Sequence, residues 1–221
     1  MKRPLATAGC HAGAPDLLVM LPGAYMRAED YAAAGFFAAV EARRLALDVV
    51  AVDLDLAAIS TGDALPALYD DILVPARTRY RRIWLGGISL GGLLALAQAA
   101  GAPESIDGLC LIAPYPGNRL TLNAIDHAGG LDAWVPSADD LADPEFLVWD
   151  WLRRPPAALP AFVGWGEDDR FAAGMAAIAH RFPEAARCTL PGGHDWPVWT
   201  RLWERFLDRT LFAATEAGGP A

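Results

Sequence analysis

The chain has 221 residues, of which 54% are hydrophobic and 20% are charged, and its formal net charge at pH 7 is −9. This length and composition predict a single globular domain, residues 1–221, and exclude a disordered chain. The negative charge argues against a nucleic acid partner, because binding to a phosphate backbone depends on basic side chains. No apolar run approaches the ~18 residues that a membrane span requires.

Three cysteines, Cys10, Cys110 and Cys188, are too few and too widely spaced to predict a disulfide framework or a metal-binding knuckle. Reduced thiols suit a cytoplasmic protein, which is the localisation that we predict. We expect neither a metal nor a cofactor, and nothing in the sequence indicates an oligomeric state.

Apolar runs typical of strands buried on both faces of a sheet alternate with segments of helical pattern. The expected strands are residues 17–21, 47–54, 82–85, 106–113, 161–165 and 186–190. The expected helices are residues 28–45, 64–80, 90–100 and 171–181, followed by a closing helix with an apolar stripe over 199–207. Pro75 is expected to kink or end the second helix. We expect residues 1–16 to form a loose lead-in and residues 55–62 a loop.

This alternation of strands and helices predicts an α/β fold with a mostly parallel central sheet and helices on both faces. Only residues 115–160 break the alternation, with Trp134, Trp149 and Trp151 among several prolines. We expect this segment to form short helices over one end of the sheet, as a short cap-like insertion.

A serine flanked by glycines stands in the sequence LGGISLGG, residues 85–92. An expected strand precedes it and an expected helix follows it, which is the setting of a nucleophile elbow, a strained turn that exposes the hydroxyl of Ser89. Gly87 and Gly91 suit this turn because a Cβ there would clash with the neighbouring strand and helix. A glycine-rich turn that binds a phosphate is the alternative interpretation of these residues.

A nucleophilic serine needs a base within hydrogen-bonding distance. Among four histidines, His194 is the best candidate, because it lies in a loop between the last expected strand and the closing helix. In a parallel sheet such loops meet at the carboxyl ends of the strands, which is the edge that would display Ser89. The other histidines, His11, His127 and His180, lie in the lead-in, in the 115–160 segment and near a helix end.

The base needs a carboxylate to hold its tautomer. Three acids, Glu167, Asp168 and Asp169, follow the strand expected at 161–165. Asp169 is our first choice and Asp168 the second, although helix capping would explain one acid at this position. The chain order Ser89, Asp169, His194 is the order typical of an α/β-hydrolase.

Attack of a serine on a carbonyl produces a tetrahedral intermediate with a negatively charged oxygen, the oxyanion. This oxygen needs hydrogen-bond donors, each of which commonly contributes about 3 kcal/mol of transition-state stabilisation. The N–H of Leu90 would be one donor, and the loop Pro22-Gly23-Ala24-Tyr25 after the first strong strand would supply the other.

Together these motifs resemble the α/β-hydrolase superfamily, and specifically a small serine esterase, over residues 17–212. Leu-Pro-Gly-Ala takes the place of the family's His-Gly-x oxyanion loop, which implies that Ala24 is the second donor. Gly166 to Phe171 resembles the family's Gly-x-x-Asp acid turn, which singles out Asp169, and Gly193-His194 matches its last loop. The sequence departs from the family in having Pro22 at the histidine position and a small cap.

The resemblance implies a serine hydrolase that cleaves small-molecule carboxylic esters through an acyl-enzyme. Thioester hydrolysis by the same residues is the alternative, and a non-catalytic ligand-binding module on the same fold is a remote one. No phosphate-binding G-x-x-x-x-G-K-[ST] or G-x-G-x-x-G motif supports the binding module. We expect Tyr25, Trp165 and Trp196 to contact an apolar acyl or alcohol group.

Overall fold

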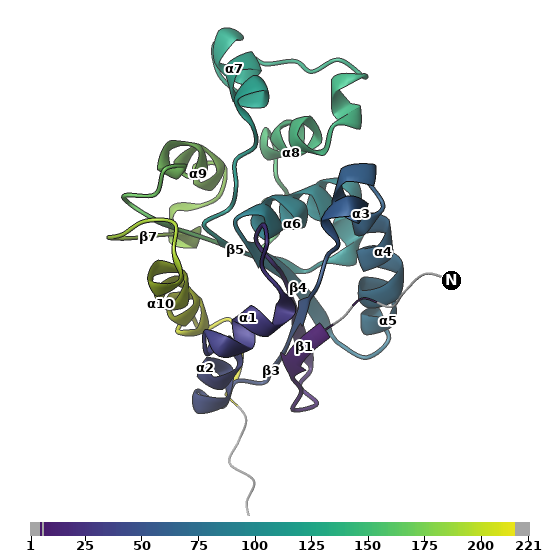
Figure 1. Ribbon diagram of the computed structural model, residues 1–221, viewed down its shortest axis with the longest axis vertical. Helices are drawn as coiled ribbons and strands as arrows, with labels where there is room; N and C mark the ends of the chain where they lie inside the picture. Colours follow the sequence, from purple (N-terminus) through teal and green to yellow (C-terminus); the bar gives the residue numbers. More distant parts are fainter. Residues whose placement is uncertain (1–4, 6, 215–221) are drawn as a thin grey trace, which may run out of the picture.

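Seven strands form one sheet in the computed structural model, which describes residue 5 and residues 7–214 (Figure 1). The strand order is β1-β3-β2-β4-β5-β6-β7, in which β1 runs antiparallel to β3 and the other neighbours are parallel. The strands are β1 (Thr7–Cys10), β2 (Asp16–Leu21), β3 (Leu47–Val52), β4 (Arg82–Ile88), β5 (Gly108–Ile112), β6 (Ala161–Gly166) and β7 (Arg187–Leu190). The predicted α/β fold with a mostly parallel sheet is confirmed.

Helices cover both faces of this sheet (Figure 1). On one side lie α1 (Ala28–Ala33), α2 (Phe36–Ala42) and α10 (Trp196–Leu207), and on the other α4 (Ala64–Leu68), α5 (Val74–Arg77) and α6 (Leu90–Gly101). The remaining helical elements are α3 (Leu56–Thr61), η1 (Tyr69–Leu73), η2 (Pro103–Ser105), α7 (Arg119–His127), η3 (Asp140–Ala142), α8 (Pro144–Leu152), α9 (Ala172–Ala179) and η4 (Glu184–Ala186). Within the described part of the chain, no helix is both long and apolar enough to cross a bilayer.

The apolar stripe of α10 explains how this helix is held. Trp203 stacks on Phe36 of α2 with ring centroids 4.9 Å apart, and its indole N–H donates to the Phe36 carbonyl at 2.9 Å. Phe206 packs against Trp84 of β4 and Phe162 of β6. The closing helix therefore fixes the position of the loop that precedes it.

The strand order reverses between β2 and β4. The chain passes from β2 to β3 on one side and then crosses to β4 on the other side of β2. Ligands of open α/β sheets bind at the carboxyl ends of the strands at such a reversal. The loop after β2 and the turn after β4 both begin at this position.

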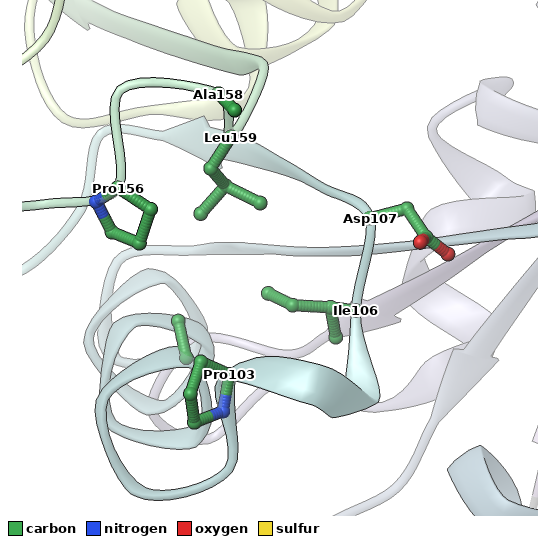
Figure 2. Close-up of a pocket in the computed structure, with 7 residues that line it drawn as sticks. Pro103, Ile106, Asp107, Pro156, Ala158 and Leu159 are labelled. Atoms are coloured by element: carbon green, nitrogen blue, oxygen red, sulfur yellow. The ribbon is translucent and has the colours of Figure 1, made fainter.

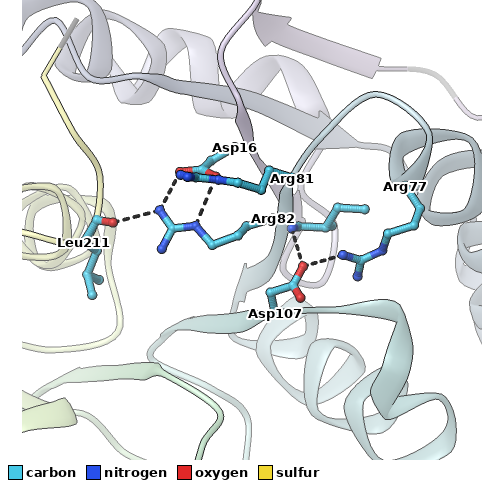
Figure 3. A network of polar contacts seen from close by, with 7 residues as sticks. Asp16, Arg77, Arg81, Arg82, Asp107 and Leu211 are labelled. Atoms are coloured by element: carbon cyan, nitrogen blue, oxygen red, sulfur yellow. Dashed lines mark hydrogen bonds and ion pairs between the residues drawn. The ribbon is translucent and has the colours of Figure 1, made fainter.

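The amino ends of the strands carry an ion-pair network instead (Figure 3). Asp16, at the start of β2, is 1% exposed and accepts hydrogen bonds from Arg82 Nε at 3.0 Å and Nη2 at 2.5 Å. Arg81 lies 3.5 Å from the same carboxylate, and Arg82 also donates to the Leu211 carbonyl at 2.9 Å. Figure 3 also shows Asp107, which accepts from Arg77 Nη1 at 2.5 Å and from the Ile83 N–H at 2.8 Å.

The expectation of a loose lead-in is wrong for Thr7–Cys10, which forms β1 at the edge of the sheet. A short edge strand pairs through its backbone and needs no apolar run, so its side-chain pattern does not reveal it. Asp48 of β3 holds the turn that follows, because its carboxylate accepts from the N–H groups of Ala12 at 2.8 Å and Ala14 at 3.1 Å. Residues 1–4 and 6 of the expected lead-in lie outside the described residues.

The helix expected over 28–45 is two helices, α1 and α2, because Gly35 between them adopts a left-handed φ of 80°. The loop expected over 55–62 contains α3. Asp55 caps this helix by accepting from the Ala57 N–H at 2.9 Å, which is a common way to start a helix.

The helix expected over 64–80 is interrupted by the π-helical turn η1. Pro75 follows in α5, where the backbone stays helical, and a proline has no N–H to donate to the preceding turn. The interruption that was expected at Pro75 therefore falls at η1, one turn earlier in the chain.

Candidate active site

Ser89 lies in a strained turn between β4 and α6. Its φ of 53° and ψ of −113° are sparsely populated by residues with a side chain. A Cβ at Gly87 would meet the backbone of Gly91, and a Cβ at Gly91 would meet the Leu21 carbonyl at the end of β2. Both glycines are therefore needed for α6 to begin so close to two strands.

The side chains of Ser89, His194 and Asp169 form one hydrogen-bonded chain. His194 Nε2 lies 2.9 Å from Ser89 Oγ, and His194 Nδ1 lies 2.5 Å from Asp169 Oδ2. Because a carboxylate accepts hydrogen bonds, the Nδ1–H donates to Asp169, and Nε2 is then the acceptor that faces the Ser89 hydroxyl. The His194 side chain is 14% exposed and that of Asp169 is fully buried.

The two loops that carry Asp169 and His194 extend the pairing of β6 with β7. The Glu167 N–H donates to the Leu190 carbonyl at 2.8 Å, and the Asp168 N–H donates to the Gly192 carbonyl at 3.0 Å. Asp168 itself is exposed, and its carboxylate accepts from the Gly192 N–H at 3.2 Å. Of the three candidate acids, the structure thus brings Asp169 to the histidine, while Asp168 contacts the backbone of the histidine loop.

Two aromatic rings flank His194. The ring of Phe171 lies 5.6 Å from it at an interplanar angle of 83°, and that of Trp199 lies 5.1 Å away at 87°. Edge-to-face contacts of this kind are favourable and fix the plane of the imidazole. Trp199 is 8% exposed, and its buried indole N–H has no hydrogen-bond partner in the described part of the chain.

The N–H of Leu90 lies at the start of α6, directly after Ser89. Neither this N–H nor that of Ala24 has a hydrogen-bond partner among residues 5 and 7–214. The loop of Ala24 lies against the turn of Ser89. The two backbones are so close that a Cβ added at Gly23 would be 3.3 Å from the Ile88 carbonyl oxygen. The Met26 N–H closes this loop on the Gly23 carbonyl at 3.1 Å.

The three residues expected to contact substrate have different surroundings. Tyr25 is 91% exposed and has a left-handed φ of 64°, in the loop of Ala24. Trp196 is half-buried and packs on Trp199 with ring centroids 5.2 Å apart. Trp165 lies in β6 and belongs to the hydrophobic core. It is only 8% exposed, so it offers little surface to a ligand.

Sequence reasoning did not include Tyr115 and Phe171 among the site residues. The Tyr115 N–H donates to the Ser89 carbonyl at 2.9 Å, and the Phe171 N–H donates to Asp169 Oδ1 at 2.9 Å. Tyr115 closely follows an expected strand, and Phe171 lies two residues after the preferred acid. Their positions at strand ends were the signal that could have identified them.

A cavity of about 350 Å³ lies at the opposite edge of the sheet, where β5 and β6 begin (Figure 2). Its lining includes Pro103, Ile106, Pro156 and Leu159. This cavity is therefore separate from the Ser89 site. Within the described residues, no group of three or more histidine, cysteine or acidic side chains could hold a metal ion.

Residues 18–219 match the alpha/beta hydrolase family, and the chain belongs to this family. The resemblance to the α/β-hydrolase superfamily that the sequence motifs indicate is thereby confirmed. No curated protein matches the chain significantly.

Several solved structures share this fold. Est1E from Butyrivibrio proteoclasticus, with bound ferulic acid, has a TM-score of 0.62 and 14% identity over 92% of this chain and 94% of that chain. An S-formylglutathione hydrolase from Staphylococcus aureus has a TM-score of 0.61 and 15% identity over 90% and 84% of the two chains. FphF, a fluorophosphonate-binding serine hydrolase of S. aureus, has a TM-score of 0.60 and 14% identity over 93% and 98%. At these identities the similarity concerns the fold.

Proposed function

We propose that the protein is a serine hydrolase that cleaves carboxylic esters through an acyl-enzyme intermediate. The observation that carries this proposal is the hydrogen-bonded chain from Ser89 Oγ through His194 to the buried carboxylate of Asp169. Membership of the alpha/beta hydrolase family supports it, as does the fold shared with Est1E and FphF.

In the first half of the reaction, Ser89 Oγ attacks the ester carbonyl carbon and its proton passes to His194 Nε2. Asp169 accepts the Nδ1–H and stabilises the imidazolium that forms. The N–H groups of Leu90 and Ala24 donate to the oxyanion. The intermediate then collapses: the bond to the alcohol oxygen breaks, His194 protonates the leaving alcohol, and the acyl group stays on Ser89.

In the second half, His194 takes a proton from water, and the resulting hydroxide attacks the acyl carbon. The bond to Ser89 Oγ breaks, His194 returns the proton to Ser89, and the carboxylic acid leaves. The segment 115–160 would cover this site, since α7 and α8 project beyond the edge of the sheet where β4 and β5 end (Figure 1). A thioester would be cleaved by the same steps with a thiol as leaving group.

The test is labelling of the purified protein with a fluorophosphonate probe, together with hydrolysis of p-nitrophenyl esters and of a thioester with the same acyl group. We expect labelling of the native protein, and we expect Ser89→Ala to abolish labelling and lower kcat by at least about 10⁴-fold. Ser105→Ala in η2 is the matched control, because Ser105 donates to the Ala102 carbonyl at 2.6 Å, away from the site, and should remain labelled. A folded native protein that neither reacts with the probe nor cleaves any ester or thioester would overturn the proposal.

A further inference from the structure

Tyr115 and Phe171, here called the aromatic wall, stand beside the reacting serine and histidine. Tyr115 is bonded through its N–H to the Ser89 carbonyl, and Phe171 through its N–H to the Asp169 carboxylate. Both backbone positions are therefore tied to the residues of the hydrogen-bonded chain itself. Because β5 and β6 lie on the opposite side of β4 from β2, the wall and the loop of Ala24 follow strands on opposite sides of the strand that leads to Ser89.

The two rings continue the aromatic surface of His194 outward. Phe171 lies 5.6 Å from the His194 ring, and Tyr115 lies 5.2 Å from Phe171 at an interplanar angle of 78°. On the inner side of His194, Trp199 is buried, whereas Tyr115 and Phe171 are both only half-buried. On this side of His194 the wall is therefore more exposed than Trp199 is on the other.

The surroundings of the wall indicate recognition by ring faces. The Arg170 guanidinium lies 4.7 Å from the Phe171 ring centroid, a cation–π contact over one face of this ring. Burial and the nearby Glu145 carboxylate raise the pKa of Tyr115, so its phenol stays neutral at physiological pH. Two neutral rings at an edge-to-face angle can hold a third ring in a corner, and aromatic pairs gain energy beyond their buried area.

We propose that the aromatic wall of Tyr115 and Phe171 binds an aromatic ring carried by the acyl or alcohol part of the substrate, next to the ester bond that Ser89 attacks. This inference rests on the proposed ester hydrolysis and specifies its substrate class. The competing explanation is that Phe171 acts only by holding His194, in which case its loss would slow all substrates equally.

The test compares pairs of esters that differ only in whether a ring is aromatic. Ethyl 3-phenylpropanoate and ethyl 3-cyclohexylpropanoate test the acyl side, because in neither does the ring conjugate with the carbonyl. Benzyl acetate and cyclohexylmethyl acetate test the alcohol side. The readout is the ratio of kcat/KM for the aromatic over the saturated ester, which does not depend on the folded fraction.

We expect the native protein to favour the aromatic member of at least one pair, and Tyr115→Leu and Phe171→Leu each to lower that ratio about three- to tenfold. Tyr115→Phe keeps the ring and should keep the ratio. Tyr80→Leu is the matched control at the opposite edge, where the Tyr80 hydroxyl bonds Asp48 at 2.9 Å, and it should also leave the ratio unchanged. Ratios that stay the same in both wall variants would overturn the inference even when hydrolysis itself is established.

A binding experiment separates this inference from the proposed hydrolysis. If no ester is cleaved, calorimetry with 3-phenylpropanol and 3-cyclohexylpropanol as ligands of the Ser89→Ala protein still tests the wall. We expect tighter binding of the aromatic alcohol, and we expect Tyr115→Leu to remove the difference. Equal affinities of the two alcohols would overturn the inference.

Discussion

Asp16 and Asp169 are both buried carboxylates at strand ends, yet they lie at opposite edges of the sheet and have different partners. Asp16, at the amino end of β2, receives two hydrogen bonds from Arg82 (Figure 3). Asp169, beyond the carboxyl end of β6, receives hydrogen bonds from His194 and from the Phe171 N–H. An arginine stays charged, whereas a histidine takes up and releases protons near neutral pH.

The partner therefore decides what a buried carboxylate does. A partner of permanent charge makes Asp16 part of the fold, while a partner that exchanges protons suits Asp169 to the proposed reaction. Substitutions at the amino-end edge should consequently change stability and leave the turnover of each folded molecule intact. Substitutions at the carboxyl-end edge should do the reverse.

The largest effect is expected for Asp169→Asn. An amide would no longer hold the Nδ1–H tautomer of His194, so kcat should fall by about 10⁴-fold while the fold persists. The kcat for a p-nitrophenyl ester and the circular dichroism spectrum measure the two quantities. Asp168→Asn is the matched control, because among residues 5 and 7–214 its carboxylate accepts only from the Gly192 N–H, and kcat should change by no more than a few-fold. Equal losses in the two variants would contradict the choice of Asp169.

The next effect is expected at the other edge, for Arg82→Leu. The substitution leaves the Asp16 carboxylate buried with Arg81 3.5 Å away as its remaining cation, which should lower the free energy of unfolding by about 3 kcal/mol. Hydrogen bonds from Arg82 to Asp16 raise the pKa of Arg82, so the arginine stays charged in moderately alkaline solution, and its contribution to stability is lost as the pH rises through that raised pKa.

Urea unfolding measures this loss. Asp16→Asn is the informative companion variant, because the arginines that it leaves unpaired reach solvent, and it should cost less than Arg82→Leu. Esterase activity per folded molecule should be unchanged in both variants. A loss of kcat comparable to that of Asp169→Asn would show that the two edges are not separable.

The sequence predicts most strands, and Ser89 and His194 as candidate site residues, because these features depend on short stretches of chain. Apolar runs predict strands that are buried on both faces, and the residue after such a run lies at the carboxyl end of a strand whatever the rest of the fold is. Asp168 and Asp169 could not be separated by physical reasoning from the sequence, since their difference depends on which carboxylate turns toward His194 when the two loops pair.

The rest depends on relations between distant segments. Tyr115 reaches Ser89 only because β5 pairs with β4 in a register that also places the Ser89 N–H 3.1 Å from the Ile112 carbonyl. β1 is likewise defined by pairing with β3 rather than by its own side chains. The break at Gly35 was visible as a glycine, but a single glycine inside a helical pattern does not reveal whether the helix continues.

The smallest effect is expected for Trp199→Phe. The buried Trp199 N–H has no partner in the described part of the chain, and an unsatisfied buried donor costs about 1–3 kcal/mol. Phenylalanine removes that donor but keeps a ring against His194, so the gain offsets the loss of packing and the free energy of unfolding should change by less than about 1 kcal/mol, with kcat retained. Trp199→Ala removes the ring as well and should cost about 3 kcal/mol and lower kcat. Trp199→Phe could instead lower the free energy of unfolding and kcat as much as Trp199→Ala does. The indole N–H would then have an essential partner, and the ring contacts of His194 alone would not explain the role of Trp199.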